Sequence, residues 1–307
     1  MTLDDLLYKP GLLAGQRILV SGGGTGLGRV MSEGLQLLGA DVIICGRRGG
    51  VLEDTARELN AAHGPGSSTQ PAAHPAGKVS AYLCDIRHPE AITEMLDKVW
   101  AEQGPLTGLI NNAAGNFISR TEDLSSRAFD AIANIVFRGS FNMTLDCGKR
   151  WLAAGQKASV LSILTTWVWN GSPFTVPSAM SKAGLNAMTQ SLAVEWGGRG
   201  IRFNAIAPGL FPTEGMSARL NPGGGEHKAE GNPMHRTGRM PELANLAVYL
   251  MSPGAEYVNG QTIAIDGANY QANGGNFSRL TQWTDEQWAQ ARASIAGTDA
   301  KNRAQRG

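Results

Sequence analysis

Short apolar runs alternate with longer amphipathic stretches along most of the chain. The short runs are rich in Val, Ile and Leu and almost continuously hydrophobic, which is typical of strands covered on both faces. Strands separated by helices favour right-handed crossovers and a parallel sheet. The pattern predicts strands over Arg17–Val20, Val42–Cys45, Val79–Cys84, Leu109–Asn111, Ser159–Ile163, Arg202–Ala207 and Thr262–Ile265, and helices over Gly26–Leu38, Val51–Ala62, Pro89–Gln103, Arg127–Ala154, Ser178–Trp196 and Pro241–Leu250.

Seven strands in this rhythm predict an α/β chain with a single-domain Rossmann fold and a seven-stranded parallel doubly wound sheet over 1–307. Three segments interrupt the rhythm. Residues 64–77 are rich in Pro, Gly and Ser and predict an exposed loop excursion, flanked by solvated His63 and His74. Residues 211–235 predict a substrate lid, and 277–307 a C-terminal extension with a helical pattern.

Composition and charge exclude several classes of protein. Lys and Arg number 27 against 26 Asp and Glu, so the basic surplus of a nucleic-acid binder is missing. No run of about 18 apolar residues exists, which argues against a membrane span. Cys45, Cys84 and Cys147 lack metal-ligand spacing, so we expect no metal, and we expect buried thiols at Cys45 and Cys84, which end apolar runs. A reducing compartment and an acidic N-terminus without a signal pattern favour the cytoplasm.

A glycine-rich turn follows the first predicted strand and opens the first predicted helix. Glycines at this place let the backbone approach a pyrophosphate, which then meets the positive end of the helix dipole. The alternative is a merely tight turn. The residues expected at the cofactor are Gly22, Gly24, Thr25, Gly26, Leu27 and Gly28.

Two arginines, Arg47 and Arg48, follow the second predicted strand, where a carboxylate would bind the ribose hydroxyl of NAD. Guanidinium groups instead suit a 2′-phosphate, which they grip with charge-assisted hydrogen bonds. The arginines therefore favour NADP(H), although a solvated pair is the alternative.

The spacing of Gly22, Gly26 and Gly28 resembles the glycine motif of the short-chain dehydrogenase/reductase family. Other residues agree: Asp85 and Ile86 resemble its adenine-contacting pair, Asn111–Gly115 its Asn-Asn-Ala-Gly motif, and Pro208–Gly209 its nicotinamide-side turn. The resemblance places Asn112 and Ala113 at the cofactor as well. It also implies a homo-oligomer, usually a tetramer.

The active site departs from the usual Tyr-x-x-x-Lys of that family. Lys182 fits the Lys, but the Tyr position is Ser178. General acid catalysis needs a pKa near the working pH, and a serine hydroxyl is far too weak an acid. Reversible ketone–alcohol chemistry is therefore disfavoured.

One branch of the family, the 2,4-dienoyl-CoA reductases, has this Ser-x-x-x-Lys arrangement, and the chain resembles it from Leu12 to Ile295. The shared segments include Asn111–Ser119, Pro177–Ala179, Lys182–Gly184, Glu195–Gly197, Ser217–Leu220 and Thr284–Trp288. The resemblance implies that Asn116 binds the thioester carbonyl, that Lys182 holds the nicotinamide ribose and that Ser178 supports it. It also implies that Phe117, Ser125 and Arg219 contact the acyl-CoA.

Trp167 stands fifteen residues before Lys182, where mitochondrial-type dienoyl reductases place a Tyr as second carbonyl donor. Trp167 is either an apolar wall of the acyl pocket or a donor through its indole N–H, which cannot transfer a proton in this pH range. Thr165 or Thr166 offers a hydroxyl instead. Plainer roles remain open elsewhere: a loop-capping amide for Asn116, a helix N-cap for Ser178, and a solvated charge for Lys182 or Arg219.

The sequence thus predicts an NADPH-dependent oxidoreductase that reduces an α,β-unsaturated acyl-CoA, above all a 2,4-dienoyl-CoA in fatty-acid β-oxidation. Fixed hydrogen-bond donors suffice for this chemistry, because the charge collects on a thioester oxygen. The alternatives are another short-chain oxidoreductase with an atypical active site and an NADP-binding pseudoenzyme without activity.

Overall fold

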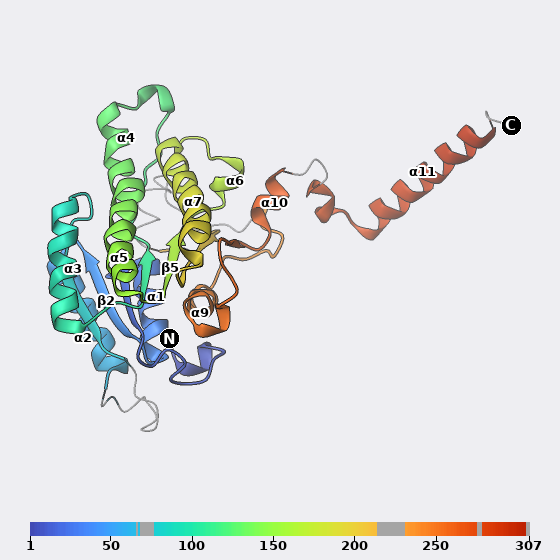
Figure 1. Cartoon of the computed structure of the whole chain (residues 1–307). Coiled ribbons are helices and arrows are strands. Elements are labelled where there is room, and N and C mark those ends of the chain that lie inside the picture. Colours follow the sequence, from blue (N-terminus) through green and yellow to red (C-terminus); the bar gives the residue numbers. More distant parts are fainter. Residues whose placement is uncertain (66, 68–76, 214–230, 275–277, 305–307) are drawn as a thin grey trace.

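A sheet of seven parallel strands, in the order β3-β2-β1-β4-β5-β6-β7, forms the centre of the computed structural model (Figure 1). The structure describes all residues except 66, 68–76, 214–230, 275–277 and 305–307. The strand order reverses beside β1, which pairs with both β2 and β4. This confirms the predicted doubly wound α/β fold. The strands are β1 (Arg17–Ser21), β2 (Asp41–Gly46), β3 (Val79–Leu83), β4 (Gly108–Asn111), β5 (Ala158–Ile163), β6 (Ile201–Pro208) and β7 (Thr262–Ile265).

Helices cover both faces of the sheet, as the continuous hydrophobicity of the strands requires. Successive side chains of β1 point to opposite faces of the sheet. Ile18 and Val20 belong to one buried core cluster, and Leu19 belongs to the other. The first face carries α1 (Gly26–Leu37), α2 (Gly49–His63) and α9 (Met240–Met251), and the second carries α3 (Pro89–Gln103), α5 (Ser140–Ala154) and α7 (Val176–Gly197).

The chain also forms further helical segments, most of them short. They are 3-10 turns at Leu3–Asp5, Thr121–Asp123, Pro253–Ala255 and Ser278–Gln282, and the helices α4 (Ser126–Ala133), α6 (Trp167–Asn170), α10 (Asn269–Gly274) and α11 (Asp285–Ala304).

The single helix predicted over Arg127–Ala154 is wrong in one respect. A π-helical segment, Asn134–Gly139, divides it into α4 and α5. The chain here runs directly against the residue pair after β3: a Cβ on Gly139 would lie 2.8 Å from the Ile86 side chain. Periodicity alone does not reveal the widened turn, because the amphipathic pattern continues through it.

The predicted loop excursion at 64–77 lies mostly outside the described residues, but its first neighbour is a correction. His63 is not solvated: its side chain is 12% exposed, and its Nε2 lies 2.9 Å from Glu33 Oε1. The Met1 ammonium lies 2.9 Å from the same oxygen. His74 is outside the described residues. The carboxylate of Glu33 on α1 thus joins the chain start to the end of α2.

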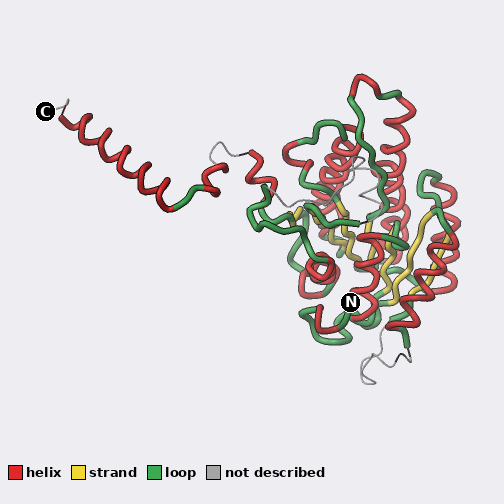
Figure 2. Tube along the Cα trace, turned by 180° about the vertical axis from the view of Figure 1, so that it is seen from behind, coloured by secondary structure: helices red, strands yellow, loops and turns green. Residues whose placement is uncertain are grey.

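The predicted C-terminal extension is helical where it is described. Helix α11 stands clear of the sheet and its helices in both views (Figures 1 and 2). Just before it, Trp283 meets Trp288 edge to face, with ring centroids 5.0 Å apart. Among the described residues, no helix combines the length and hydrophobicity needed to cross a membrane.

Candidate active site

A cleft of about 1010 Å³ opens at the carboxyl ends of the strands, where doubly wound sheets bind ligands. It begins beside β2 and β3 and runs past β1 and β4 to the segments that follow β5, β6 and β7. Most of the predicted site residues lie in its wall: Gly22, Gly24, Thr25, Leu27, Gly28, Arg47, Arg48, Asp85, Ile86, Asn112, Ala113, Asn116, Trp167, Ser178, Lys182, Pro208 and Gly209.

The glycine turn packs so tightly that side chains have no room there. A Cβ on Gly28 would lie 2.3 Å from the Gly22 carbonyl oxygen, and one on Gly22 would touch the Ala113 backbone at 3.0 Å. Asn112 fixes the turn from β4 by donating its Nδ2 to the Ser21 carbonyl at 2.9 Å and to Gly22 at 3.2 Å. Gly26 belongs to the turn with φ of 54° but does not line the cleft.

The end of the cleft beside β2 and β3 carries the charges that would recognise the adenosine half of a dinucleotide. Arg47 and Arg48 are exposed, and neither forms an ion pair with a described carboxylate. Asp85, by contrast, accepts two hydrogen bonds from Arg87 Nε at 2.9 and 3.0 Å. These bonds from the Arg87 guanidinium lower the pKa of the Asp85 carboxyl below its usual range.

Two of the three thiols form the floor of the same end. Cys45 and Cys84 line the cleft yet are buried, and Cys147 is buried deeper in the second core. Burial raises the pKa of Cys84 to about 11 and the pKa of Cys45 well above its ordinary value. The thiols therefore stay protonated, as expected of small buried apolar groups.

Lys182 and Ser178 project from the first two turns of α7, one helical turn apart. Lys182 is 5% exposed, so the solvated alternative is wrong. Its Nζ donates to the carbonyl of Ile163 at the end of β5. Desolvation of the ammonium lowers the Lys182 pKa to about 8. Thr175 occupies the N-cap and Ser178 lies inside the first turn, so the N-cap alternative for Ser178 is wrong too.

Asn116 lines the cleft, and its amide oxygen is already used. Asn116 Oδ1 accepts the backbone N–H of Phe117 at 2.9 Å. A backbone N–H can only donate, so this bond fixes which amide atom is the oxygen. The capping role thus holds for the oxygen, and it leaves the Nδ2 hydrogens without a described acceptor.

The segment after β5 adds two threonines and an indole to the wall. The Thr165 Oγ1 is buried and has no hydrogen-bond partner among the described residues. A buried hydroxyl without a partner is costly. Trp167, two residues on, lines the cleft and is half-buried. Both threonines of this segment, Thr165 and Thr166, lie in the lining.

Two of the residues expected at the acyl-CoA, Phe117 and Ser125, are not in the cleft lining. Phe117 packs against the small helical cluster around Val136 and Leu164 rather than in the cleft lining. Ser125 is the N-cap of α4, where its side chain accepts from the Ala128 N–H at 3.1 Å. Arg219 lies outside the described residues, as do residues 214–230 of the predicted lid.

Other cleft residues were missing from the sequence prediction. Ile135 enters from the π-helical segment, Thr213 from the chain after β6, and Asn269 from the start of α10. The rule that ligands bind at carboxyl ends of strands applies equally to β7, and it could have pointed to Asn269. Nothing in the periodicity could have pointed to Ile135.

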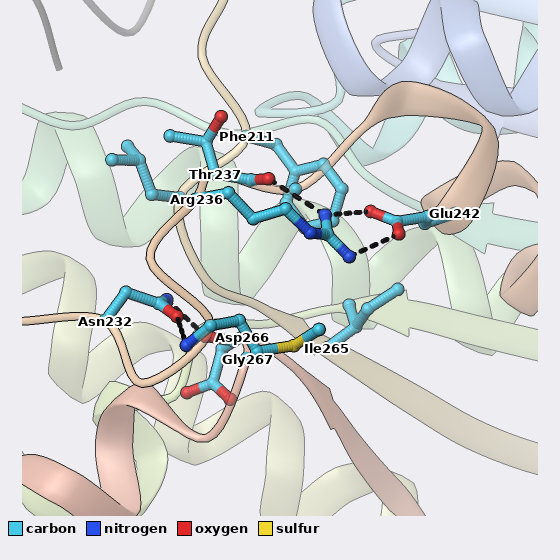
Figure 3. A pocket seen from close by; sticks show the side chains of 11 residues that line it. Phe211, Asn232, Arg236, Thr237, Glu242, Ile265, Asp266 and Gly267 are labelled. Carbon is cyan, nitrogen blue, oxygen red and sulfur yellow. Dashed lines mark hydrogen bonds and ion pairs between the residues drawn. The ribbon is translucent and has the colours of Figure 1, made fainter. Parts of the chain in front are cut away.

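A smaller hollow of about 290 Å³ adjoins the cleft and shares Leu210 and Phe211 with it (Figure 3). Arg236 donates to both oxygens of Glu242, at 2.9 and 2.7 Å. This pair lowers the pKa of Glu242 to about 2. On its other side, Asn232 donates its Nδ2 to the Asp266 carbonyl at 2.9 Å and so ties the chain before α9 to the end of β7.

These residues fit a nicotinamide dinucleotide. The glycine turn leaves the backbone bare at a helix N-terminus, where a pyrophosphate binds. At the opposite end, the buried Lys182 ammonium has only one described hydrogen-bond acceptor, the Ile163 carbonyl, for its three donors. An unpaired buried ammonium is costly, and ribose hydroxyls would satisfy its remaining donors.

Comparison with known proteins agrees with this fold and site. The family model described as Enoyl-(Acyl carrier protein) reductase matches residues 22–268, from the glycine turn to the residues after β7. The chain belongs to the short-chain dehydrogenase/reductase family.

Individual relatives indicate which members of the short-chain dehydrogenase/reductase family the chain is similar to. A Caenorhabditis elegans protein named "Probable 2,4-dienoyl-CoA reductase decr-1.2 [(3E)-enoyl-CoA-producing]" is 38% identical over 305 residues, 97% of this chain and 95% of that protein. The solved citronellol catabolism dehydrogenase AtuB of Pseudomonas aeruginosa is 33% identical with a TM-score of 0.74, over 87% of this chain and all of its own. A Beutenbergia cavernae structure with bound NADP is 26% identical with a TM-score of 0.73, over 85% and 98%. The protein is thus an oxidoreductase related to 2,4-dienoyl-CoA reductases.

Proposed function

We propose that the protein reduces α,β-unsaturated acyl-CoA thioesters with NADPH, and that its substrate is a 2,4-dienoyl-CoA of fatty-acid β-oxidation. The observation that carries the proposal is the make-up of the cleft wall. Its described lining includes Asn116, whose amide N–H groups have no described acceptor, and Thr165, whose buried hydroxyl has no described partner, and it holds no tyrosine. Such a wall suits a reaction that needs hydrogen-bond donors and needs no titrating acid.

Bound NADPH would supply a hydride to the far end of the conjugated system. Negative charge then collects on the thioester oxygen, where donors placed in advance contribute most to the rate, about 3–4 kcal/mol each in comparable sites. We assign Asn116 Nδ2 to this oxygen, and Thr165 Oγ1 as a second donor that must become exposed to reach it. Water completes the reduction by protonating carbon, so no side chain has to release a proton.

Lys182 would hold the nicotinamide ribose, with its ammonium directed into the cleft from α7 and braced on Ile163. Ser178, one turn before it and 3% exposed, would support this arrangement. Arg47 and Arg48 would bind the 2′-phosphate at the opposite end of the cleft, and Asp85 with Ile86 the adenine. The preference for NADPH over NADH rests on these two exposed arginines, for which the described residues supply no ion pair.

Trp167 keeps two possible functions in this scheme. As a wall, its indole would pack against the acyl group. As a donor, its N–H would assist Asn116 electrostatically. The unpaired Thr165 hydroxyl supports the wall, because it would offer a second donor two residues before Trp167.

The surroundings of the reaction are part of the proposal. We place it in the cytoplasm, because the three buried free thiols suit a reducing compartment, and we expect a homotetramer. Arg219 would bind a CoA phosphate, and Ser125 and Phe117 would flank the acyl-CoA. Size-exclusion chromatography with light scattering, and microscopy of the tagged protein, test the first two assignments.

NADPH oxidation in the presence of sorbyl-CoA or decadienoyl-CoA tests the reaction itself. We expect turnover with dienoyl-CoA, and we expect the Asn116→Leu variant to lose about 100-fold in kcat with unchanged NADPH affinity. Turnover only of other activated alkenes or carbonyls would indicate a different short-chain oxidoreductase. Tight NADPH binding without turnover of any substrate would indicate a pseudoenzyme.

A further inference from the structure

The short helix α6 sends three consecutive side chains in three directions. Trp167 lines the cleft, Val168 packs on the helical cluster around Leu164, and Trp169 points outward with 42% of its surface exposed. Gly171, with φ of 69°, ends the helix after this single turn. Because Trp167 and Trp169 share this one turn, a contact that fixes Trp169 also restricts the position of Trp167.

Trp169 is held by Tyr270 of α10. The two rings stack with centroids 4.6 Å apart and an interplanar angle of 21°. Hydrogen bonds to Asp266 hold the backbone of Tyr270 in place. The Tyr270 N–H donates to Asp266 Oδ2 at 2.9 Å, and the Asp266 carbonyl accepts from Asn232 (Figure 3). The residue before Tyr270, Asn269, lines the cleft.

The stack thus joins two walls of the cleft. One wall follows β5 and the other follows β7, and these strands are separated in the sheet by β6. The stack therefore belongs to the β5–β7 half of the sheet, and Arg47 and Asp85 follow β2 and β3 at the opposite edge.

The chemistry of this end suits a hydrocarbon chain better than the phosphates of coenzyme A. The nearest arginine described in the adjoining hollow, Arg236, is committed to Glu242 through two hydrogen bonds. Two large aromatic faces remain, and apolar groups are favoured against them.

We infer that the Trp169–Tyr270 stack closes the acyl end of the cleft and sets the longest acyl chain that the enzyme accepts. The inference rests on the proposed function and assigns a specificity role to two side chains outside the cleft lining. A methylene that finds buried room gains about fourfold in affinity. Opening the stack should therefore favour long chains progressively.

Trp169→Ala and Tyr270→Ala test the inference, and Trp169→Phe and Tyr270→Phe keep a ring at each place. Trp288→Ala is a matched control, since Trp288 is 39% exposed and belongs to an aromatic pair away from the cleft. For each variant, kcat and KM are measured with six-, ten- and fourteen-carbon dienoyl-CoA. Thermal unfolding and NADPH titration show whether the variant is folded.

We expect both alanine variants to raise the ratio of fourteen- to six-carbon kcat/KM at least about tenfold, through KM, and the ring-keeping and control variants to leave it unchanged. Folded alanine variants with the wild-type profile would overturn the inference. Should either alanine variant unfold, the Leu variants at the same positions take its place.

Binding separates this inference from the proposed function. Calorimetric titration with saturated acyl-CoA of the same lengths needs no turnover. If the wild type reduces no dienoyl-CoA but the alanine variants gain affinity for the long acyl-CoA, the proposed reaction fails and the length limit stands. If dienoyl-CoA is reduced and the length profile does not move, the length limit fails alone.

Discussion

The two ends of the cleft are built by different means. Around β1 to β4, the backbone packs closely because Gly22 and Gly28 have no side chain. Neighbouring atoms occupy the space where a Cβ would stand. After β5 and β7, positions are set by side chains such as Trp167 and Trp169, which are half-buried or exposed. At Gly22 and Gly28 the first end therefore has no room for an added atom, whereas we expect that the second end can change without loss of the fold.

Gly28→Ala should have the largest effect of these substitutions, because it adds an atom where the glycine turn has no room. The added methyl group would lie 2.3 Å from the Gly22 carbonyl oxygen and 2.5 Å from Asn112 Nδ2, so the turn must move. We expect NADPH affinity to fall more than about 100-fold, in proportion to the several kcal/mol that such overpacking costs. Fluorescence titration measures the affinity. Gly50→Ala, where nothing lies within 4 Å of the new atom, is the control.

Lys182→Met should separate activity from stability. We expect reductase activity to fall about 10- to 100-fold through the loss of the ribose contact, while the free energy of unfolding at pH 7 rises by up to about 3 kcal/mol. The rise follows because the fold holds a buried ammonium whose pKa is lowered to about 8. Urea unfolding of both proteins measures it, and unchanged or lower stability would contradict the buried charge.

The same lysine makes a prediction about pH with a definite sign. Its pKa is about 8 in the folded protein and near 10.5 when unfolded, so the unfolded chain binds more protons between these values. Stability should therefore rise as the pH passes from about 8 to 10.5, and the penalty is fully present below pH 8. NADPH affinity of the free enzyme should fall over the same range, and Lys182→Met should show neither trend.

Arg47→Ala and Arg48→Ala test whether the β2 end of the cleft distinguishes NADPH from NADH. Each should weaken NADPH binding about tenfold and leave NADH binding nearly unchanged, because a charge-assisted bond to the 2′-phosphate is lost. Titration with both cofactors measures the ratio. An equal loss for the two cofactors would mean that the arginines do not bind the 2′-phosphate.

Trp167→Phe should have the smallest effect. If the indole is a wall, the phenyl ring replaces most of its surface, and kcat on dienoyl-CoA should stay within about twofold. A loss near 100-fold would instead make the indole N–H a donor to the thioester oxygen. Thr165→Val, which removes the unpaired hydroxyl, completes the pair.

Much of the architecture was predictable because it depends on local patterns. Strand periodicity fixed the order of elements, and the glycine turn between Val20 and the first helix located the cofactor end. What escaped prediction depends on contacts distant in sequence. Ile135 reaches the cleft only because the helix widens against Ile86, and His63 is buried only because Glu33 lies beside it. No spacing rule contains these pairs.

The site residues divide in the same way. Lys182 and Ser178 were predictable as one face of a helix, but the position of the N-cap at Thr175 depends on where the chain turns after Gly171. The free donors of Asn116 follow from a backbone bond to Phe117 that no motif announces.

The buried thiols of Cys45, Cys84 and Cys147 can also report how often the folded protein opens. A thiolate-specific alkylating reagent reaches each of them only when a local or global opening exposes it, because burial keeps the thiols protonated and covered. Their labelling rate then counts opening events. A comparison of Cys84 at the cleft floor with Cys147 in the core would tell breathing of the cleft from opening of the whole molecule.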